Sequence, residues 1–174
     1  IIENVDKLRD TSASHHRCSI VEVMGNRCGD LALYAAITSG AEVVITKETG
    51  YDELEVLDRL RTIEDRKKKR HAVVIISEKI TDVELLAQKI SQNTGFSGRS
   101  TVLGHIQRGG SPTGRDRILA TRFGDFAVAL LKDGMTSKSV GIVSDSIVAM
   151  DIDDALIAPR KSRKHLFDLQ KRLV

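Results

Sequence analysis

Residues 19–46 read SIVEVMGNRCGDLALYAAITSGAEVVIT and predict a strand, a helix and a second strand in succession. The β-branched runs 19–24 and 42–46 are apolar on both faces, which is typical of strands buried in a parallel sheet between layers of helices. Between them, residues 30–39 are rich in Leu and Ala and end before Gly40, a residue that readily adopts the left-handed conformation of a helix C-cap. A unit of this kind closes through a right-handed crossover, so this stretch indicates an α/β fold.

The same alternation continues along the chain and extends the predicted sheet. Further strands are predicted at residues 72–76, 100–103 and 140–143. Three further helices are predicted from capping residues and from the spacing of apolar residues. They run from Asp52 to about Lys69 with Leu54, Leu57 and Leu60 on one stripe, from Asp82 to Thr94 with Val83, Leu86, Ala87 and Ile90 on one face, and from Thr113 to Lys132 with Leu119, Phe123, Phe126 and Leu130 on one face before Gly134. The predicted fold class is therefore α/β, a parallel sheet flanked by helices.

The composition indicates an ordinary globular chain. Of its 174 residues 41% are hydrophobic, and 27 Lys and Arg against 24 Asp and Glu give a net charge of +3. The cysteines Cys18 and Cys28 lack metal-ligand spacing and can form at most one bridge, which excludes a disulfide scaffold and a zinc module and favours a cytoplasmic location. No apolar run is long enough to span a membrane. The first residues, IIENVDKLRD, begin inside a helical stretch and carry no signal peptide, so we expect a fragment.

Two basic runs, at residues 66–71 and 160–172, are candidates for binding an anion. Cations in the last turn of a helix are favoured by the helix dipole, so solvated helix ends are the plainer interpretation. The functional interpretations are an anionic small molecule or a nucleic acid. Nucleic acid is the weaker of these, because no DNA- or RNA-binding motif occurs and aromatic residues make up only 3% of the chain.

Ligands of open α/β sheets bind beyond the carboxyl ends of the strands, so the residues there are the site candidates. The first strand leads into residues 24–29, MGNRCG, whose glycines let the backbone approach a ligand or merely fit a tight turn. Glu78 follows the third strand, where its carboxylate can accept hydrogen bonds from sugar hydroxyls or cap the next turn. His105 and Arg108 follow the fourth strand, before Gly-Gly-Ser-Pro at 109–112, and this basic pair favours a phosphate site over a solvated loop.

Arg17 and Arg99 are predicted to begin strands, at the edge of the sheet opposite to His105 and Glu78. In one monomer the two arginines could hardly meet the same ligand as that pair. In a symmetric oligomer they could reach the site of a neighbouring subunit. For either arginine alone, the plainer interpretation is a solvent-exposed side chain at a strand end.

Several of these stretches together resemble the bacterial ATP-dependent 6-phosphofructokinases. They are KLRDT at 7–11, IVEVMG at 20–25 with Gly-Asp at 29–30, DRILA at 116–120, VGI at 140–142 and, most specifically, TVLGHIQRGGSP at 101–112. The resemblance covers nearly the whole chain, but only the family's C-terminal half. The family's N-terminal half carries glycine-rich ATP loops and a catalytic aspartate in a Thr-Ile-Asp-Asn-Asp motif, and neither occurs here.

This resemblance implies a kinase that transfers the γ-phosphoryl group of ATP to the 1-hydroxyl of fructose 6-phosphate in glycolysis, with Mg2+. It implies a cytoplasmic homotetramer when complete, and no activity for this fragment alone, because the ATP site and the catalytic aspartate belong mainly to the other half. Residues 1–105 would form the fructose 6-phosphate-binding (substrate) domain, residues 106–158 would return to the nucleotide domain, and the helix within 159–174 would rejoin the substrate domain.

The resemblance also assigns substrate residues by their positions in the matching motifs. His105 and Arg108 match residues that hold fructose 6-phosphate within one subunit, and Glu78 matches a carboxylate that binds the fructose hydroxyls. Met24 and Gly25 match the same pocket. Arg17 and Arg99 match arginines that cross a subunit interface to the 6-phosphate of the neighbour.

Asn26 departs from the family, which usually has Arg directly after Met-Gly; here Arg27 comes one residue later. A neutral Asn cannot stabilise the charge of a phosphoryl group in transfer. Either Arg27 takes the role through an adjusted turn, or catalysis is weakened. No catalytic residue proper is therefore assigned, and Arg27 and Arg17 are the candidates for transition-state support. We expect that Arg27 does not take the role, and that Asn26→Arg raises turnover.

An effector site for ADP or phosphoenolpyruvate is implied as well. Arg9 and Glu42 match it cleanly, and Glu42 would be the ligand of an effector-bound magnesium ion. The basic run at Arg66, Lys67, Lys68 and Lys69 carries one residue more than the family pattern, so its members cannot be assigned individually.

Three alternatives stay open. The donor could be pyrophosphate, because the residues that select it lie in the other half, although residues 104–107 look more like the ATP type. The chain could come from a catalytically silent, ligand-binding paralogue, as Asn26 suggests. Nucleic-acid binding through the basic runs would show as a steep dependence of affinity on salt.

Overall fold

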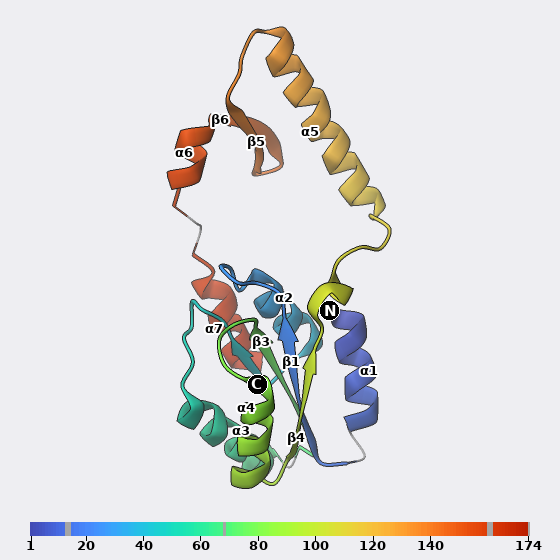
Figure 1. Ribbon diagram of the computed structural model, residues 1–174, viewed down its shortest axis with the longest axis vertical. Coiled ribbons are helices and arrows are strands. Elements are labelled where there is room, and N and C mark those ends of the chain that lie inside the picture. Colours follow the sequence, from blue (N-terminus) through green and yellow to red (C-terminus); the bar gives the residue numbers. More distant parts are fainter. Residues whose placement is uncertain (13–14, 68, 160–161, 174) are drawn as a thin grey trace. The chain divides into compact units, whose positions relative to one another are not determined.

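The computed structural model describes residues 1–12, 15–67, 69–159 and 162–173, with the side chains of Arg66 and Lys67 also outside the description. The chain divides into two compact units, each described here by itself. Unit 1 comprises residues 1–108 and 163–174, and unit 2 comprises residues 109–162. Figure 1 shows the first stretch of unit 1 in blue to yellow and its last helix in red.

Unit 1 is built on a four-stranded parallel sheet in the order β2-β3-β1-β4. Its strands are β1 (Arg17–Val23), β2 (Val43–Ile45), β3 (His71–Ser77) and β4 (Ser97–Val102). The predicted α/β fold with a parallel sheet is confirmed. One boundary was wrong, because β4 begins at Ser97 rather than at residue 100, so Arg99 is its third residue. Gly98 makes this early start feasible, since a Cβ there would lie 2.2 Å from the carbonyl oxygen of Ala87 on the covering helix.

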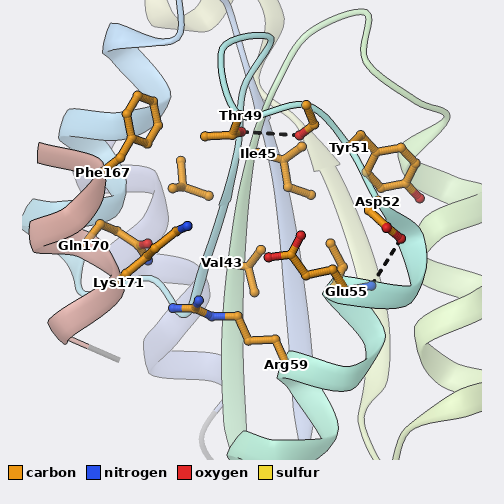
Figure 2. Close-up of a pocket in the computed structure, with 13 residues that line it drawn as sticks. Val43, Ile45, Thr49, Tyr51, Asp52, Glu55, Arg59, Phe167, Gln170 and Lys171 are labelled. Carbon is orange, nitrogen blue, oxygen red and sulfur yellow. Dashed lines mark hydrogen bonds between the residues drawn. The ribbon is translucent and has the colours of Figure 1, made fainter. Parts of the chain in front are cut away.

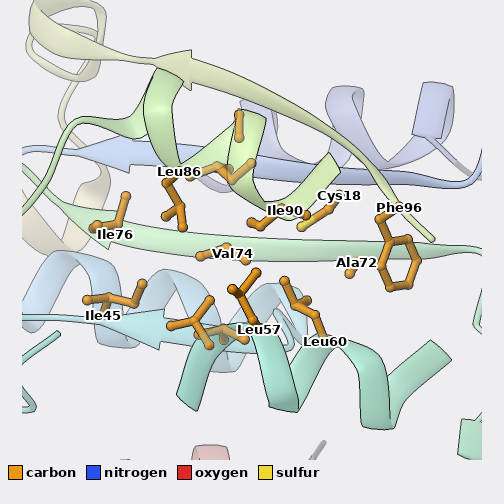
Figure 3. Close-up of a cluster of buried hydrophobic side chains, with 14 of the residues drawn as sticks. Cys18, Ile45, Leu57, Leu60, Ala72, Val74, Ile76, Leu86, Ile90 and Phe96 are labelled. Atoms are coloured by element: carbon orange, nitrogen blue, oxygen red, sulfur yellow. The ribbon is translucent and has the colours of Figure 1, made fainter. Parts of the chain in front are cut away.

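Helices cover both faces of this sheet. Successive residues of β3 point to opposite sides, so this strand contributes to a core on each face. Val74 and Ile76 join the core beneath α3 (Glu53–Lys67) and α4 (Val83–Asn93), which Figure 3 shows. Val73 and Ile75 join the other core, beneath α1 (Ile2–Ser12) and α2 (Asp30–Ser39). The last helix, α7 (Lys164–Leu173), contacts α2 and is therefore part of unit 1.

The predicted caps of unit 1 are largely confirmed. Gly40 ends α2 in the left-handed conformation at φ +65°, and Asp82 accepts hydrogen bonds from the N–H groups of Glu84 and Leu85 at the start of α4. The predicted stripe of α3 was partly wrong, because Leu54 is 70% exposed. Leu57 and Leu60 are buried as predicted, and Val56 and Ile63 complete the buried face.

Unit 2 contains one long helix and one hairpin. Helix α5 (Gly114–Lys132) begins at Thr113, which forms a reciprocal capping box with Asp116. Strands β5 (Lys138–Val143) and β6 (Ser146–Asp151) pair antiparallel, and the short helix α6 (Ile152–Ile157) follows. The strand predicted at 140–143 exists, but its place in the parallel sheet was wrong. The two-residue turn at Ser144 and Asp145, with φ of 49° and 65°, makes it a hairpin.

Candidate functional site

Side chains from all four strand ends of unit 1 meet at the carboxyl edge of the sheet. Val23, the last residue of β1, lies in register with Ser77, the last residue of β3. The segments that follow these strands carry Asn26 and Glu78. Beyond β4, a single 3-10 turn η1 (Gly104–Gln107) carries His105 and leads directly to Arg108. The structure therefore brings the sequence-predicted substrate residues Met24, Gly25, Asn26, Glu78, His105 and Arg108 to one edge.

Glu78 organises the loop between β1 and α2. Its Oε1 accepts hydrogen bonds from the backbone N–H groups of Gly25 and Asn26, at 3.1 Å each. Gly25 adopts φ +142°, and a Cβ there would lie 2.6 Å from the carbonyl oxygen of Cys28, so only glycine fits this turn. The other carboxylate oxygen of Glu78 has no partner among the described residues, so it remains able to accept a hydrogen bond from a ligand hydroxyl.

The start of α2 is closed by a second carboxylate. Glu48 accepts a hydrogen bond from the N–H of Gly29 at 2.9 Å. Burial raises the pKa of Glu48, but the N–H groups of Gly29 and of Glu48 itself bond the ionised form and lower the pKa overall. The loop therefore offers its N–H groups at Gly25, Asn26 and Gly29 to side chains of the same unit. These three hydrogen bonds favour the tight-turn interpretation of the glycines at 24–29.

Gln107 is a site residue that the sequence reasoning missed. Its amide oxygen accepts a hydrogen bond from the N–H of Met24 at 3.2 Å, and its amide nitrogen donates to the carbonyl oxygen of Gly104 at 3.0 Å. The side chain thus fixes η1, which carries His105, against the end of β1. The sequence feature that could have indicated Gln107 as a site residue is its position inside the motif at residues 101–112.

Lys47 is the second residue that was missed. It follows β2, and its ammonium donates a hydrogen bond to the side-chain oxygen of Asn26 at 3.2 Å. Nothing in the local pattern TKET at 46–49 distinguishes this lysine from a solvated one. Arg27, the residue considered as a substitute for the family's arginine, is exposed.

A half-buried carboxylate lies within the same edge. Burial raises the pKa of Glu22 in β1, and the nearby carboxylates of Glu78 and Asp82 raise it further. The carboxyl edge therefore combines acidic groups near its centre with basic side chains at either side. That pattern suits a ligand with hydroxyl groups in the middle and an anionic group at an end.

Arg17 and Arg99 lie toward the opposite edge of the sheet. Arg17 opens β1 beside Ser97, and Ser19 lies beside Arg99. With about 3.3 Å of rise per residue, the seven residues of β1 separate Arg17 from Met24 by roughly 20 Å along the strand. Arg17 therefore lies far from the carboxyl end of the sheet, and Arg99, the third residue of β4, lies three residues before the end of its strand. Their reach to a neighbouring subunit stays a prediction.

The predicted effector residues are partly brought together. Glu42 is 1% exposed; one carboxylate oxygen accepts from the Lys69 ammonium at 2.9 Å and the other from the N–H of Val73 at 2.7 Å. Arg9 has a buried Nε without a hydrogen-bond partner among the described residues. Lys68 and the side chains of Arg66 and Lys67 lie outside the described residues. Arg59, which was not predicted, donates from Nε to the carbonyl oxygen of Glu42 at 3.0 Å.

A cavity of about 130 Å³ opens beside the outer edge of β2, between α3 and α7. Figure 2 shows Val43 and Ile45 on its floor, with Glu55 and Arg59 on one side and Lys171 on the other. Its lining includes none of the predicted substrate residues. In the described part of the chain, no cluster of three His, Cys, Asp or Glu side chains could hold a metal ion. None of the described helices has the length and apolarity that crossing a bilayer requires.

Comparisons with known proteins identify relatives of this chain. Residues 1–131 match the family model described as "Phosphofructokinase". The chain is 51% identical over 174 residues to an ATP-dependent 6-phosphofructokinase of Teredinibacter turnerae and 46% identical to one of Clostridium acetobutylicum. Each alignment covers 99% of this chain and 54% of the relative, so the chain spans about half the length of these relatives.

Solved structures show the same fold. The structure of Pichia pastoris phosphofructokinase in the T-state superposes with a TM-score of 0.79 at 27% sequence identity. That superposition covers 99% of this chain and 20% of the yeast chain.

Proposed function

Because this chain belongs to the phosphofructokinase family, we propose that it is the fructose 6-phosphate-binding half of an ATP-dependent 6-phosphofructokinase. The complete enzyme would transfer the γ-phosphoryl group of ATP to the 1-hydroxyl of fructose 6-phosphate in the cytoplasm. The observation that carries the proposal is the carboxyl edge of the sheet, where Glu78 after β3 and His105 and Arg108 after β4 lie on either side of the end of β1. Hydrogen bonds of Glu78 and of Gln107 to the loop after β1 connect the two sides.

The roles follow from the chemistry of each side chain. The unpartnered oxygen of Glu78 accepts a hydrogen bond from a fructose hydroxyl, while its other oxygen holds the Gly25–Asn26 turn beside the sugar. His105 and Arg108 are both exposed and hold the 6-phosphate, with the guanidinium forming paired hydrogen bonds to phosphate oxygens. Arg17 and Arg99, at the other edge, complete the 6-phosphate site of a neighbouring subunit in a homotetramer.

Unit 2 supports the proposed domain arrangement. Among its described residues only Leu130 is buried, so the apolar side chains of this unit need a further surface to cover them. We assign residues 1–105 and 159–174 to the substrate domain and 106–158 to a nucleotide domain that this chain does not complete. ATP, Mg2+ and the catalytic aspartate would belong mainly to the remainder of that domain, so this chain alone would have no kinase activity.

The effector site is proposed at Arg9, Glu42 and Lys69, for ADP or phosphoenolpyruvate. The buried Nε of Arg9 that lacks a described partner supports anion binding there. A magnesium ion at Glu42 would have to displace Lys69 from its carboxylate, since both oxygens are hydrogen-bonded. If Glu42 takes part in this effector site, Glu42→Ala should change the response to ADP. The affinity for fructose 6-phosphate without effector should stay nearly constant.

The test is calorimetric titration of the complete enzyme with fructose 6-phosphate and with fructose, beside a turnover assay with ATP. We expect the enzyme to bind fructose 6-phosphate but not fructose. Arg108→Ala should weaken the affinity for fructose 6-phosphate at least about tenfold. Arg115→Ala, an exposed arginine of α5, is the matched control. Binding without turnover would favour the silent paralogue, turnover with pyrophosphate but not ATP would favour the pyrophosphate type, and failure to bind the sugar phosphate would overturn the proposal.

A further inference from the structure

The position of Lys47 follows from the order of the strands. Across the sheet β2-β3-β1-β4, the strand ends lead in turn to Lys47, Glu78, Asn26 and His105. Lys47 and Asn26 come from strands that are separated by β3, yet the Lys47 ammonium reaches the Asn26 side chain at 3.2 Å. The lysine side chain therefore crosses the carboxyl end of β3, next to the place where Glu78 holds the Gly25–Asn26 turn.

The charge of Lys47 is not neutralised by this contact. Its partner is a neutral amide oxygen, and Lys47 forms no ion pair with any described residue. An ammonium held by an amide keeps its full charge and two further donor hydrogens for a ligand. The Asn26 oxygen limits where the ammonium can lie, so the cation is placed at the edge instead of moving freely in solvent.

Two cationic groups thus lie along the row of strand ends: the Lys47 ammonium, held by Asn26 beyond the end of β1, and the pair His105 and Arg108 beyond β4. Backbones of neighbouring strands such as β1 and β4 lie about 4.8 Å apart. His105 and Arg108 lie at one end, where the proposed function places the 6-phosphate. A sugar that receives a second phosphoryl group at its other end needs a second cation, and Lys47 is the described cation that contacts the Asn26 turn.

We propose that Lys47 supplies the positive charge that binds the phosphoryl group during its transfer to the 1-hydroxyl, with Asn26 orienting the ammonium. This inference rests on the proposed function. In the transfer, the 1-hydroxyl oxygen forms a bond to the γ-phosphorus of ATP, and the bond from that phosphorus to the bridging oxygen of ADP breaks. ADP leaves, and the hydroxyl proton passes to the catalytic aspartate that the proposed function assigns to the rest of the enzyme. The ammonium offsets charge on the transferring oxygens, which is the main contribution that a protein makes to this reaction.

The first experiment measures turnover of the complete enzyme at saturating ATP. We expect Lys47→Met to lower kcat about tenfold to a hundredfold, with KM for fructose 6-phosphate changed less than about twofold. Lys47→Arg should retain most activity, because it keeps the charge. Lys7→Met, an exposed lysine on α1, is the matched control and should match wild type.

The second experiment separates a direct role from a structural one. Lys47→Met should weaken binding of fructose 1,6-bisphosphate about tenfold and leave fructose 6-phosphate binding unchanged. Asn26→Arg should restore turnover in the Lys47→Met background, because either cation then serves the same group. In wild type it should add little, which replaces the gain expected from the sequence, because Lys47 already supplies a cation beside Asn26. Equal weakening of both ligands, or full activity of Lys47→Met, would overturn the role of Lys47 while leaving the proposed function intact. A wild-type enzyme that neither binds the sugar phosphate nor turns it over would overturn both.

Discussion

Helices α4 and α5 each carry four apolar residues at positions that share one helix face, yet the structure fully buries only one of the two faces. In α4 of unit 1, Val83, Leu86, Ala87 and Ile90 are all at most 6% exposed. In α5 of unit 2, the corresponding face of Leu119, Phe123, Phe126 and Leu130 has only its last member buried. Periodicity therefore says which face of a helix is apolar, and the rest of the chain decides whether that face finds a partner.

The reason lies in what each unit offers as a covering surface. Unit 1 has a four-stranded sheet whose two faces each receive two helices, so its side chains form two closed cores. In the described part of unit 2, only a hairpin and a short helix accompany α5, and Leu156 and Ile157 of that short helix are 78% and 81% exposed. A two-stranded hairpin is marginal without further strands or helices to cover it.

The largest expected difference between the units concerns truncation of a leucine in each. Leu60→Ala in the core of unit 1 should lower the free energy of unfolding by about 3 kcal/mol, because it leaves a cavity in a fully buried cluster. Leu131→Ala in α5 should change it by less than about 0.5 kcal/mol, since this side chain is 64% exposed. Urea unfolding followed by circular dichroism measures both. Equal losses would mean that unit 2 is as well packed as unit 1.

A smaller difference is expected for the hydrogen bonds that fix one loop in each unit. Glu78→Ala leaves two N–H groups without an acceptor and should cost about 1–2 kcal/mol of unfolding free energy. Glu78→Gln keeps an acceptor oxygen and should cost less.

Thr113→Ala removes the cap of α5 and should lower the free energy of unfolding of unit 2 by about 1 kcal/mol. Circular dichroism should show a loss of helical signal without a shift in the unfolding midpoint of unit 1. A shift of that midpoint by Thr113→Ala would show that the units unfold together.

The smallest expected effects are opposite responses to pH. Glu22 has a raised pKa in the fold, so its contribution is fully favourable below its unfolded pKa near 4.5 and is lost as pH rises through the folded value. Glu22→Gln should therefore stabilise unit 1 at neutral pH, with no gain at acid pH. A gain that persists at acid pH would point to packing instead of charge.

Asp116 in unit 2 behaves in the reverse way. The backbone N–H of Thr113, followed by its hydroxyl, lowers the pKa of this carboxyl below 3.8, so its contribution is present above that value and is lost as pH falls. Asp116→Asn should weaken the start of α5 at neutral pH and make little difference in strong acid. Amide exchange at residues 114–117, compared between the two pH ranges, measures the effect.

The sequence-based predictions succeeded where a local pattern has one physical solution. The parallel sheet follows from short runs that are apolar on both faces, and the cap at Gly40 follows from the freedom of glycine at positive φ. They failed where the outcome depends on distant partners. Leu54 has the same spacing as Leu57 and Leu60 but lies at the helix start, beyond the edge of the core.

The candidate site shows the same division. Glu78, His105 and Arg108 could be selected from the sequence, because each follows a predicted strand and carries ligand-binding chemistry. The hydrogen bonds of Glu78 to the Gly25–Asn26 turn, and of Gln107 to Met24, could not be predicted, because the partners lie more than fifty residues apart in the chain.

By itself the sequence determined the strand–helix alternation, the apolar face of each helix and the chemical groups that follow each strand. These features depend on neighbours a few residues away, through backbone conformation and side-chain spacing. Only the tertiary structure decided that the faces of α4 and α5 differ in burial and that Lys47 meets Asn26 across the end of β3. These outcomes depend on strand order and on the surfaces available for packing, which act between residues far apart in the chain.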